Sequence, residues 1–292
     1  MYPRELFLGL NGYELCLVIG MVSALFLADL MAIKAGFSIP LQRHFVLSTI
    51  VAILVGIFGA ALFQAFYNFL ETGIFDLMKA MTFYGGLIFG AGAFLLMWFA
   101  LSKPFKLNGE AKKQFPCVAS MAAVLIPMAH GFGRIGCLLE GCCHGKITNA
   151  WFGVPHYGVS IGGEYFSKAK VVPIQLFEAL FLFALAGVLF WLYMRSAKRR
   201  QNRWQAPLLS LYMVAYGVWR FVIEFFRADD RGETIVPFLT PSQLIALLLI
   251  IGGIVYIFVW YFTRKRGKIT ETSVSEENKE NSNDKDGRDA GV

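Results

Sequence analysis

The sequence predicts an all-α integral membrane protein, a bundle of about seven transmembrane helices with its N-terminus outside and its C-terminus in the cytoplasm. Its 292 residues are 57% hydrophobic and only 16% charged, with a mean hydropathy of +0.56. Apolar runs of about 20 residues, the length that crosses a bilayer core, recur along the chain. Basic residues gather in alternate connections between these runs. Soluble proteins carry about a quarter charged residues, so the composition excludes a soluble enzyme.

Seven apolar runs lie between clusters of charged residues, and we assign one membrane span to each. The spans are residues 13–33, 45–70, 83–101, 117–139, 174–194, 207–226 and 241–262. The first is expected to remain as a membrane helix, because residues 1–16 lack the small-residue cleavage site of a signal peptide.

Basic residues determine the predicted orientation. They follow the odd-numbered spans in particular: Lys34, Arg43, Lys103, Lys106, Lys112, Lys113, Arg195, Lys198, Arg199, Arg200, Arg203, Arg264, Lys265, Arg266 and Lys268. The positive-inside bias places these connections in the cytoplasm, so the net charge of +7 reflects topology and we expect no nucleic-acid partner. Residues 269–292 have too few apolar residues to form a core, which predicts a disordered cytoplasmic tail after a transmembrane catalytic domain at 1–268.

Several spans contain polar side chains, which are costly in a membrane and indicate a functional site. In the sixth span Tyr216, Arg220, Glu224 and Arg227 are spaced four, four and three residues apart, so they form one polar stripe. In the fourth span His130 and Arg134 share a helix face, with three glycines interleaved: Gly131, Gly133 and Gly136.

The predicted topology places these groups in the outer half of the membrane. The other polar residues at that level are Tyr13, Gln64, Asn68, Tyr84, Gln175 and Glu178. A cavity open to the outer leaflet would accommodate them all. The guanidinium group of an arginine can bind two oxygens of one phosphate at once. A phospholipid is the phosphate ester most available at the outer leaflet.

Two simpler interpretations remain open. Arg220 and Glu224 could pair only with each other to hold the bundle, which would leave Arg134 without a partner. Arg227 lies near the membrane interface, so its side chain could snorkel toward water.

The segment HGFGRIGCLLEGCCHG, residues 130–145, resembles the signature of the bacterial prolipoprotein diacylglyceryl transferase family, and GRIG is its most specific part. Four further segments resemble family motifs in the same order: FYGGLIFG, PIQLFEAL, YGVWRFVIEFFRADD and TPSQLIALLLIIGG. The resemblance implies a seven-span enzyme of the bacterial inner membrane whose active site faces the outer leaflet. Such an enzyme moves the diacylglyceryl group of phosphatidylglycerol to the lipobox cysteine of a prolipoprotein and releases glycerol-1-phosphate. Its partners are therefore phosphatidylglycerol, the lipobox segment and the bilayer, and no cofactor is expected.

The resemblance also implies roles for individual residues. Arg134 matches the arginine that handles the lipid headgroup, Arg220 matches the essential arginine of the sixth helix, and Tyr13 matches a tyrosine near the start of the first. Taking the resemblance together with the polar residues of the spans, we expect the catalytic residues to be Arg220, Tyr84, His130 and Glu224. We expect the substrate-binding residues to be Arg134, Gly133, Gly136, Tyr13, Tyr216 and Gln175.

The identity of the general base is open, because Tyr84 and Val172 stand where the family often has histidine. His130 and His144 are the available histidines near the outer end of the fourth span. We favour His130, which precedes Arg134 by one helical turn on the same face. Tyr84 is better suited to orienting the lipid phosphate, since an unperturbed phenol has a pKa near 10.

Three cysteines, Cys137, Cys142 and Cys143, lie within seven residues. Their spacing differs from the separated C-x2-C pairs of structural zinc sites, so we expect no metal, and a disulfide or simple packing remains open. Two other functions remain possible. A transporter of lipid headgroups or anions would need polar groups on both sides of the membrane, where the cytoplasmic half offers Asp29. A membrane thiol-redox protein would use Cys142 and Cys143 without requiring Arg220.

Overall fold

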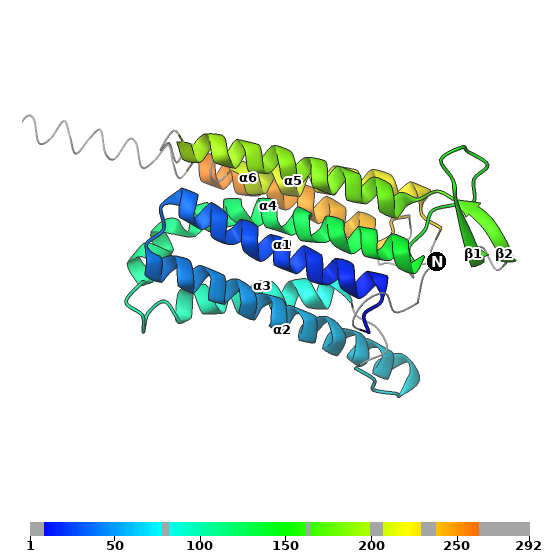
Figure 1. The fold of residues 1–292 in the computed structure, drawn as a ribbon, viewed down its shortest axis with the longest axis horizontal. Helices are drawn as coiled ribbons and strands as arrows, with labels where there is room; N and C mark the ends of the chain where they lie inside the picture. The colour runs from blue at the N-terminus through cyan, green and yellow to red at the C-terminus, as the bar shows by residue number, and fades with distance from the viewer. Residues whose placement is uncertain (1–8, 78–81, 162–163, 199–206, 229–237, 263–292) are drawn as a thin grey trace, which may run out of the picture.

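The computed structural model describes residues 9–77, 82–161, 164–198, 207–228 and 238–262. Its long helices lie side by side in a bundle, with a short β-hairpin at one end (Figure 1). The helices are α1 (Gly12–Ala35), α2 (Ile39–Thr72), α3 (Phe83–Ala100), α4 (Asn108–Glu140), α5 (Ile174–Lys198), α6 (Pro207–Ile223) and a C-terminal helix (Pro241–Phe262).

The prediction of an all-α membrane protein is confirmed. Six of the described helices are long and apolar enough to cross a membrane, and α3 is a shorter apolar helix at the position of the third predicted span. The predicted tail at 269–292 lies outside the described residues, so the division of the chain at residue 268 stays a prediction.

Two helices begin before the apolar runs that predicted them. α2 starts at Ile39 because the Ser38 side chain accepts a hydrogen bond from the backbone N–H of Leu41, with Pro40 in the first turn. α4 starts at Asn108, well before the apolar run, and continues through prolines at 116 and 127. Hydropathy marks only the part of a helix in contact with lipid, so it misses these polar first turns.

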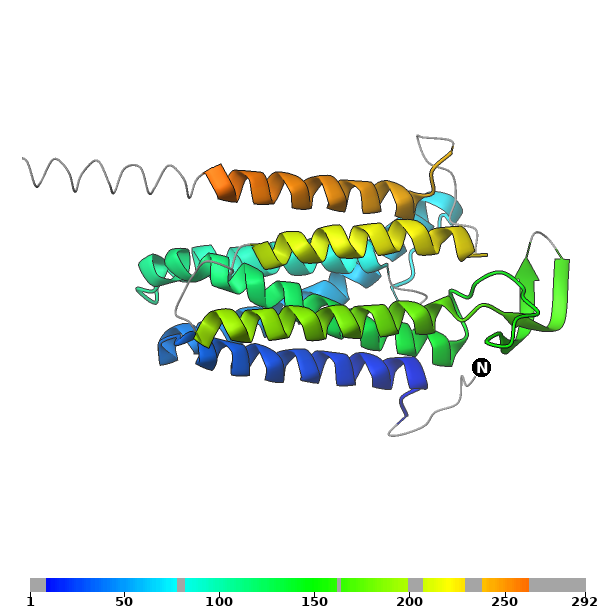
Figure 2. The same cartoon turned by 90° about the horizontal axis from the view of Figure 1, so that it is seen from above.

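Figures 1 and 2 show how the helices pack. α1 lies along α4, which also contacts α5 and α6, while α2 pairs with α3. The C-terminal helix runs beside α6 (Figure 2), where Gly217 faces Ala246 and Ile250.

Glycines permit the close approach of α2 and α3. A Cβ atom on Gly85 would lie 2.6 Å from the carbonyl oxygen of Gly59, and one on Gly56 would lie 3.1 Å from the carbonyl oxygen of Gly86. The FYGG glycines therefore serve helix packing, as small residues commonly do in membrane bundles.

The β-hairpin was not predicted. β1 (Val154–Ile161) and β2 (Glu164–Val171) pair antiparallel, from Val154 opposite Val171 to Ile161 opposite Glu164. The hairpin extends beyond the ends of α4 and α5 (Figure 1). A signal was present in the sequence, because two equal runs flank the pair Gly162–Gly163, a composition typical of two-residue hairpin turns.

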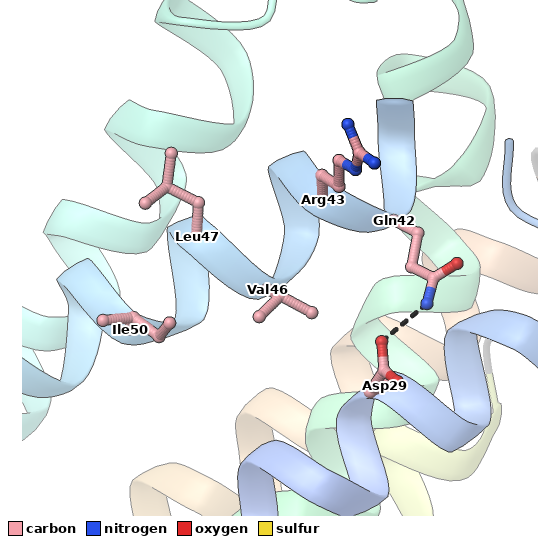
Figure 3. A pocket seen from close by; sticks show the side chains of 6 residues that line it. All are labelled: Asp29, Gln42, Arg43, Val46, Leu47 and Ile50. Atoms are coloured by element: carbon pink, nitrogen blue, oxygen red, sulfur yellow. Dashed lines mark hydrogen bonds between the residues drawn. The ribbon is translucent and has the colours of Figure 1, made fainter. Parts of the chain in front are cut away.

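Asp29 lies at the opposite end of the bundle, near the connection between α1 and α2. Its carboxylate accepts a 2.6 Å hydrogen bond from the Gln42 side-chain amide. Figure 3 shows this pair at one side of a hollow that is otherwise lined by Arg43, Val46, Leu47 and Ile50. The Asp29 carboxylate thus has a hydrogen-bond donor in the neighbouring helix α2.

We predict that Gly85→Ala lowers the free energy of unfolding by about 1–3 kcal/mol, because the new methyl group would overlap the α2 backbone. The matched control is Gly92→Ala in the same helix, where a Cβ atom meets nothing within 4 Å. Unfolding in mixed micelles, followed by circular dichroism, measures both variants. Equal stability of the two variants would contradict the packing argument.

Candidate active site

The polar residues predicted for the fourth, fifth and sixth spans meet at the end of the bundle that carries the hairpin. α4 supplies His130 and Arg134 near its C-terminus, and α5 supplies Glu178 in its second turn. α6 supplies Arg220, and the 3₁₀ turn η2 (Glu224–Phe226) that follows it supplies Glu224. Consecutive helices run in opposite directions (Figure 2), so the end of one and the start of the next reach the same level.

Glu178 is the centre of this cluster and is only 1% exposed. Its Oε2 lies 3.0 Å from Nε of Arg134 and 3.9 Å from Nη1 of Arg220. Its Oε1 accepts a 3.2 Å hydrogen bond from the hydroxyl of Tyr216. One carboxylate therefore joins α4, α5 and α6.

A second buried carboxylate, Glu224, connects this cluster to the C-terminal helix. Its Oε2 lies 2.7 Å from Nη2 of Arg220 and 3.8 Å from Nε of Arg227, and its Oε1 accepts a 3.1 Å hydrogen bond from Thr240. Nη2 of Arg220 also donates a 2.8 Å hydrogen bond to Ser242. Arg220 is thus fixed from two helices.

These contacts correct two interpretations made from the sequence. Arg220 and Glu224 do pair, but Arg134 is not left without a partner, because Glu178 on α5 binds it. Arg227 does not snorkel toward water, since it is 7% exposed and faces Glu224. The pairing of Arg134 with Glu178 joins two helices and could not follow from spacing along one of them, whereas Arg227 and Glu224 are three residues apart in the chain.

The cluster has an excess of positive charge. Three arginines face two glutamates, and all five side chains are largely or wholly buried. A buried charge without a full counter-charge is unfavourable. The Nη1 atom of Arg220 makes no hydrogen bond within the described residues. An anionic group that approached this atom would gain a donor and balance the charge.

His130 lies against the same arginine. Its Nε2 accepts a hydrogen bond from Nε of Arg134 at 3.2 Å, and its ring meets Tyr216 edge-on, with centroids 5.4 Å apart. A neutral imidazole that accepts at Nε2 carries its proton on Nδ1. His130 can therefore receive a proton at Nε2 only when Arg134 turns toward another partner.

Gly133 and Gly136, also predicted for the site, lie where α1 packs against α4, and Tyr84 lies in α3. A Cβ atom on Gly136 would lie 2.9 Å from Cδ2 of Tyr13, so Gly136 lets α1 approach α4, whereas Gly133 has only Leu17 near it, at 3.9 Å. The Tyr84 side chain lies outside the described part of the structure, although its backbone opens α3.

Among the described residues, Gln175, Gln64 and Asn68 make no hydrogen bond or ion pair with the arginine cluster. The Gln175 amide instead donates a 2.6 Å hydrogen bond to the carbonyl oxygen of Cys142. Gln64 donates to Asn68 at 2.9 Å and accepts a hydrogen bond from Thr82, so these residues link α2 to the start of α3.

A cysteine cluster lies beside this site. The Sγ atoms of Cys137, Cys142 and Cys143 are all within 4.8 Å of one another, and all five cysteines of the chain are free thiols. Gly141 and Cys143 both adopt the left-handed conformation, with φ of 82° and 61°, which folds the loop back onto the end of α4. Positive φ is uncommon for a residue with a side chain and often occurs at functional sites.

The thiols of this cluster are not equivalent. Hydrogen bonds from the Cys137 and Cys142 thiols, together with the guanidinium of Arg227, lower the pKa of Cys143. Hydrogen bonds with the same neighbouring sulfurs raise the pKa of Cys142. Of these two thiols, Cys143 therefore loses its proton more readily.

Three residues that support the site were not predicted from the sequence: Thr240, Ser242 and His156. Thr240 and Ser242 bind Glu224 and Arg220, and the segment Thr240–Gln243 has the T-x-x-Q pattern of a helix capping box, which could have indicated a helix start there. His156 of the hairpin hydrogen bonds to the carbonyl oxygen of Gly141, and its ring lies 4.7 Å from that of His144.

An apolar helical bundle with six described helices long enough to cross a membrane defines a multi-pass membrane protein, and this one buries paired arginines and glutamates at one end. The model of the prolipoprotein diacylglyceryl transferase family matches residues 5–259, and the chain belongs to this family.

Named relatives agree with this assignment. A phosphatidylglycerol–prolipoprotein diacylglyceryl transferase of Clostridium tetani is 34% identical over 268 residues, covering 90% of this chain and 97% of its own. A protein of the same name from Proteus mirabilis is 28% identical and covers 88% of this chain and 90% of its own. A second transferase of this name from Clostridium perfringens is 36% identical over 140 residues, covering 47% of this chain and 50% of its own.

We predict that Glu178→Gln lowers the free energy of unfolding by about 3 kcal/mol or more, because the change leaves two buried arginines without one of their carboxylates. The control is Asp29→Asn at the other end of the bundle, which keeps an acceptor for Gln42. Stability is measured in mixed micelles at neutral pH. If the Glu178 variant were as stable as the control, Glu178 would not be the electrostatic centre of the site.

Proposed function

We propose that the chain transfers the diacylglyceryl group of phosphatidylglycerol to the lipobox cysteine of prolipoproteins. The observation that carries the proposal is the buried cluster of three arginines and two glutamates, which lies within the residues that the family model matches. The names of the relatives supply both substrates.

The site faces the outer leaflet of the bacterial inner membrane in this proposal, with the N-terminus outside and the C-terminus in the cytoplasm. The α1–α2 and α3–α4 connections lie at the end of the bundle opposite the hairpin (Figure 1). Lys34 and Arg43 flank the first connection, and Lys103 and Lys106 lie in the second. The positive-inside bias supports a cytoplasmic location for that end.

The reaction is a displacement at the glycerol C3 carbon. The thiolate of the lipobox cysteine forms a C–S bond as the C–O bond to phosphate breaks, and the electron pair leaves with glycerol-1-phosphate. Charge on the phosphate grows along this path, so fixed cations stabilise the transition state more than the ground state. Arg134 and Arg220 are those cations.

Glutamates and a tyrosine position these arginines. Glu178 holds Arg134 at 3.0 Å, Glu224 holds Arg220 at 2.7 Å, and Tyr216 fixes Glu178. The contact between Arg220 Nη1 and Glu178 is longer, at 3.9 Å, and leaves Nη1 available to a phosphate oxygen. The site is therefore organised before the lipid arrives and needs little rearrangement to bind it.

A transporter of headgroups is less well supported than a transferase. Its polar groups would have to serve both ends of the bundle, and the Asp29 carboxylate at the far end is engaged by Gln42. A thiol-redox function would leave the arginine cluster without a role.

Complementation tests the function directly. The chain should restore lipidation of a prolipoprotein in a bacterial strain depleted of its own diacylglyceryl transferase. The measurement is the mass of a reporter prolipoprotein, with an unrelated multi-pass membrane protein as the control. Accumulation of unmodified precursor despite normal amounts of the chain in the membrane would refute the proposal.

Arg134→Ala and Arg220→Ala should each lower the transfer rate by about a hundredfold or more, the usual effect of removing a fixed donor from a developing anion. Lysine at either position should restore little activity, because an ammonium group lacks the planar fork. The double variant should lose less than the product of the single losses if both side chains bind one phosphate. Arg43→Ala, at the other end of the bundle, is the control.

Unfolding would also lower the transfer rates of these variants, because both arginines stabilise the bundle. Unfolding in mixed micelles and the KM for phosphatidylglycerol are therefore measured for every variant. Wild-type rates for both lysine variants would refute the argument from paired phosphate contacts.

His130→Gln should lower the transfer rate by about a hundredfold or more if His130 is the general base. His144→Gln should have a much smaller effect, since His144 lies against His156 and not against Arg134. Rates are measured as a function of pH with a lipobox peptide. An unchanged rate and pH profile for the His130 variant would show that another group or water takes the thiol proton.

A further inference from the structure

The cysteine cluster is unused by the mechanism above, yet it has the arrangement of a ligand set. Cys137 comes from the last turn of α4, and Cys142 and Cys143 come from the loop after it. Their three Sγ atoms lie within 4.8 Å of one another. Three sulfurs around one zinc ion, each at about 2.3 Å, would be about 3.8 Å apart, so small side-chain rotations would bring them to that spacing.

A disulfide explains the arrangement less well. It would join two of the sulfurs and leave the third beside them with no role. Cys142 and Cys143 are neighbours in the chain, and the left-handed conformation of Cys143 turns its side chain back toward the end of α4. All three sulfurs converge on one point, which is what a shared ion requires.

The loop that supplies two of the cysteines is held on three sides. The Gln175 amide of α5 donates a 2.6 Å hydrogen bond to the carbonyl oxygen of Cys142, and His156 of β1 binds the carbonyl oxygen of Gly141. The backbone N–H of Gly145 donates to the carbonyl oxygen of Val172 at 2.9 Å. A Cβ atom on Gly145 would clash with Val172 and with the carbonyl oxygen of Phe226. Hydrogen bonds of this kind fix the ligands of metal sites.

Nearby arginines offset the charge of three thiolates. Arg134 interacts electrostatically with Cys137 and Cys143, and Arg227 interacts with Cys143. Three thiolates and one divalent ion carry a net charge of minus one, and the two nearby guanidinium groups lower the electrostatic cost of that charge. The cysteine cluster therefore interacts electrostatically with two arginines of the proposed phosphate site.

Three protein ligands leave one position of a tetrahedral ion open, which is characteristic of catalytic rather than structural zinc sites. Among the described residues, no further histidine or carboxylate joins the group of ligand atoms. Cys142 is exposed, so a substrate could reach the open position. A thiol that coordinates zinc loses its proton outright and remains a nucleophile.

We infer that Cys137, Cys142 and Cys143 bind a zinc ion whose open position takes the thiol of the incoming lipobox cysteine. The inference deepens the proposed function and rests on it. The substrate thiol replaces a water on zinc and gives its proton to the general base of the proposed function. Its sulfur then forms the bond to the glycerol C3 carbon as the phosphate leaves, and the thioether product dissociates from the ion.

The first test is metal content. The full chain, purified in detergent under reducing conditions with zinc present, should hold about one zinc ion per chain by elemental analysis. Cys137→Ser, Cys142→Ser and Cys143→Ser should each lose most of it, whereas Cys16→Ser, in the buried part of α1, should keep it. Zinc contents that are negligible in the wild type, or equal in all variants, would overturn the site, as would stoichiometric iron or copper instead.

The second test is the open position. Cobalt(II) replaces zinc in the purified chain, and sulfur-to-cobalt charge-transfer absorption reports the thiolate ligands. A lipobox peptide should increase this absorption, and the same peptide with serine in place of cysteine should not. No spectral response to either peptide would overturn the role in substrate binding.

The third test separates this inference from the proposed function. Arg220→Ala should keep zinc and the cobalt response to the peptide while it loses transfer. A wild-type chain that binds zinc and the peptide thiol but lipidates nothing would refute the proposed function and leave the metal site standing. Full transfer by a chain stripped of metal would overturn the zinc inference and leave the proposed function standing.

Discussion

The functional end of the bundle depends on the balance between three buried arginine charges and two buried carboxylates. Glu178 is central, because it contacts α4 through Arg134 and α6 through Arg220 and Tyr216. Desolvation of these ions is expensive, and only mutual pairing makes their burial tolerable. The positions of α4, α5 and α6 at this end are therefore set by charge pairing as well as by apolar packing.

The same balance explains how one site can be both stable and reactive. The short contacts, at 2.7 and 3.0 Å, hold the guanidinium groups in place. The longer contact of Arg220 Nη1 with Glu178, at 3.9 Å, leaves this atom without a hydrogen bond among the described residues. A lipid phosphate can take this donor and supply the missing negative charge. Positioned charges of this kind need not reorganise as the leaving group forms.

Much of the fold followed from the sequence because the relevant signals are local. Apolar runs predicted all seven described helices, and four-residue spacing predicted the stripe that contains Arg220 and Glu224. The pairing of Arg134 with Glu178 could not be predicted, since it depends on how α4 packs against α5. The contact of Arg227 with Glu224 is local by contrast, because the two residues are three apart at the η2 turn.

The cysteine cluster shows another limit. The spacing of its residues argued against a metal, because two ligands are adjacent in the chain. Left-handed conformations at Gly141 and Cys143 nevertheless bring the three sulfurs together. The hairpin helps to hold this loop through His156. The pair Gly162–Gly163 in the sequence is typical of a hairpin turn and could have predicted it.

The most direct test of the central claim is lipid retention. The chain is placed in nanodiscs that contain equal amounts of phosphatidylglycerol and phosphatidylcholine with the same acyl chains, and native mass spectrometry identifies the lipids that stay bound after release. The account predicts one preferentially retained phosphatidylglycerol in the wild type and loss of this preference in Arg134→Gln and Arg220→Gln. Equal retention of both lipids by the wild type, or an unchanged preference in both variants, would contradict the claim that the arginine cluster binds the lipid phosphate.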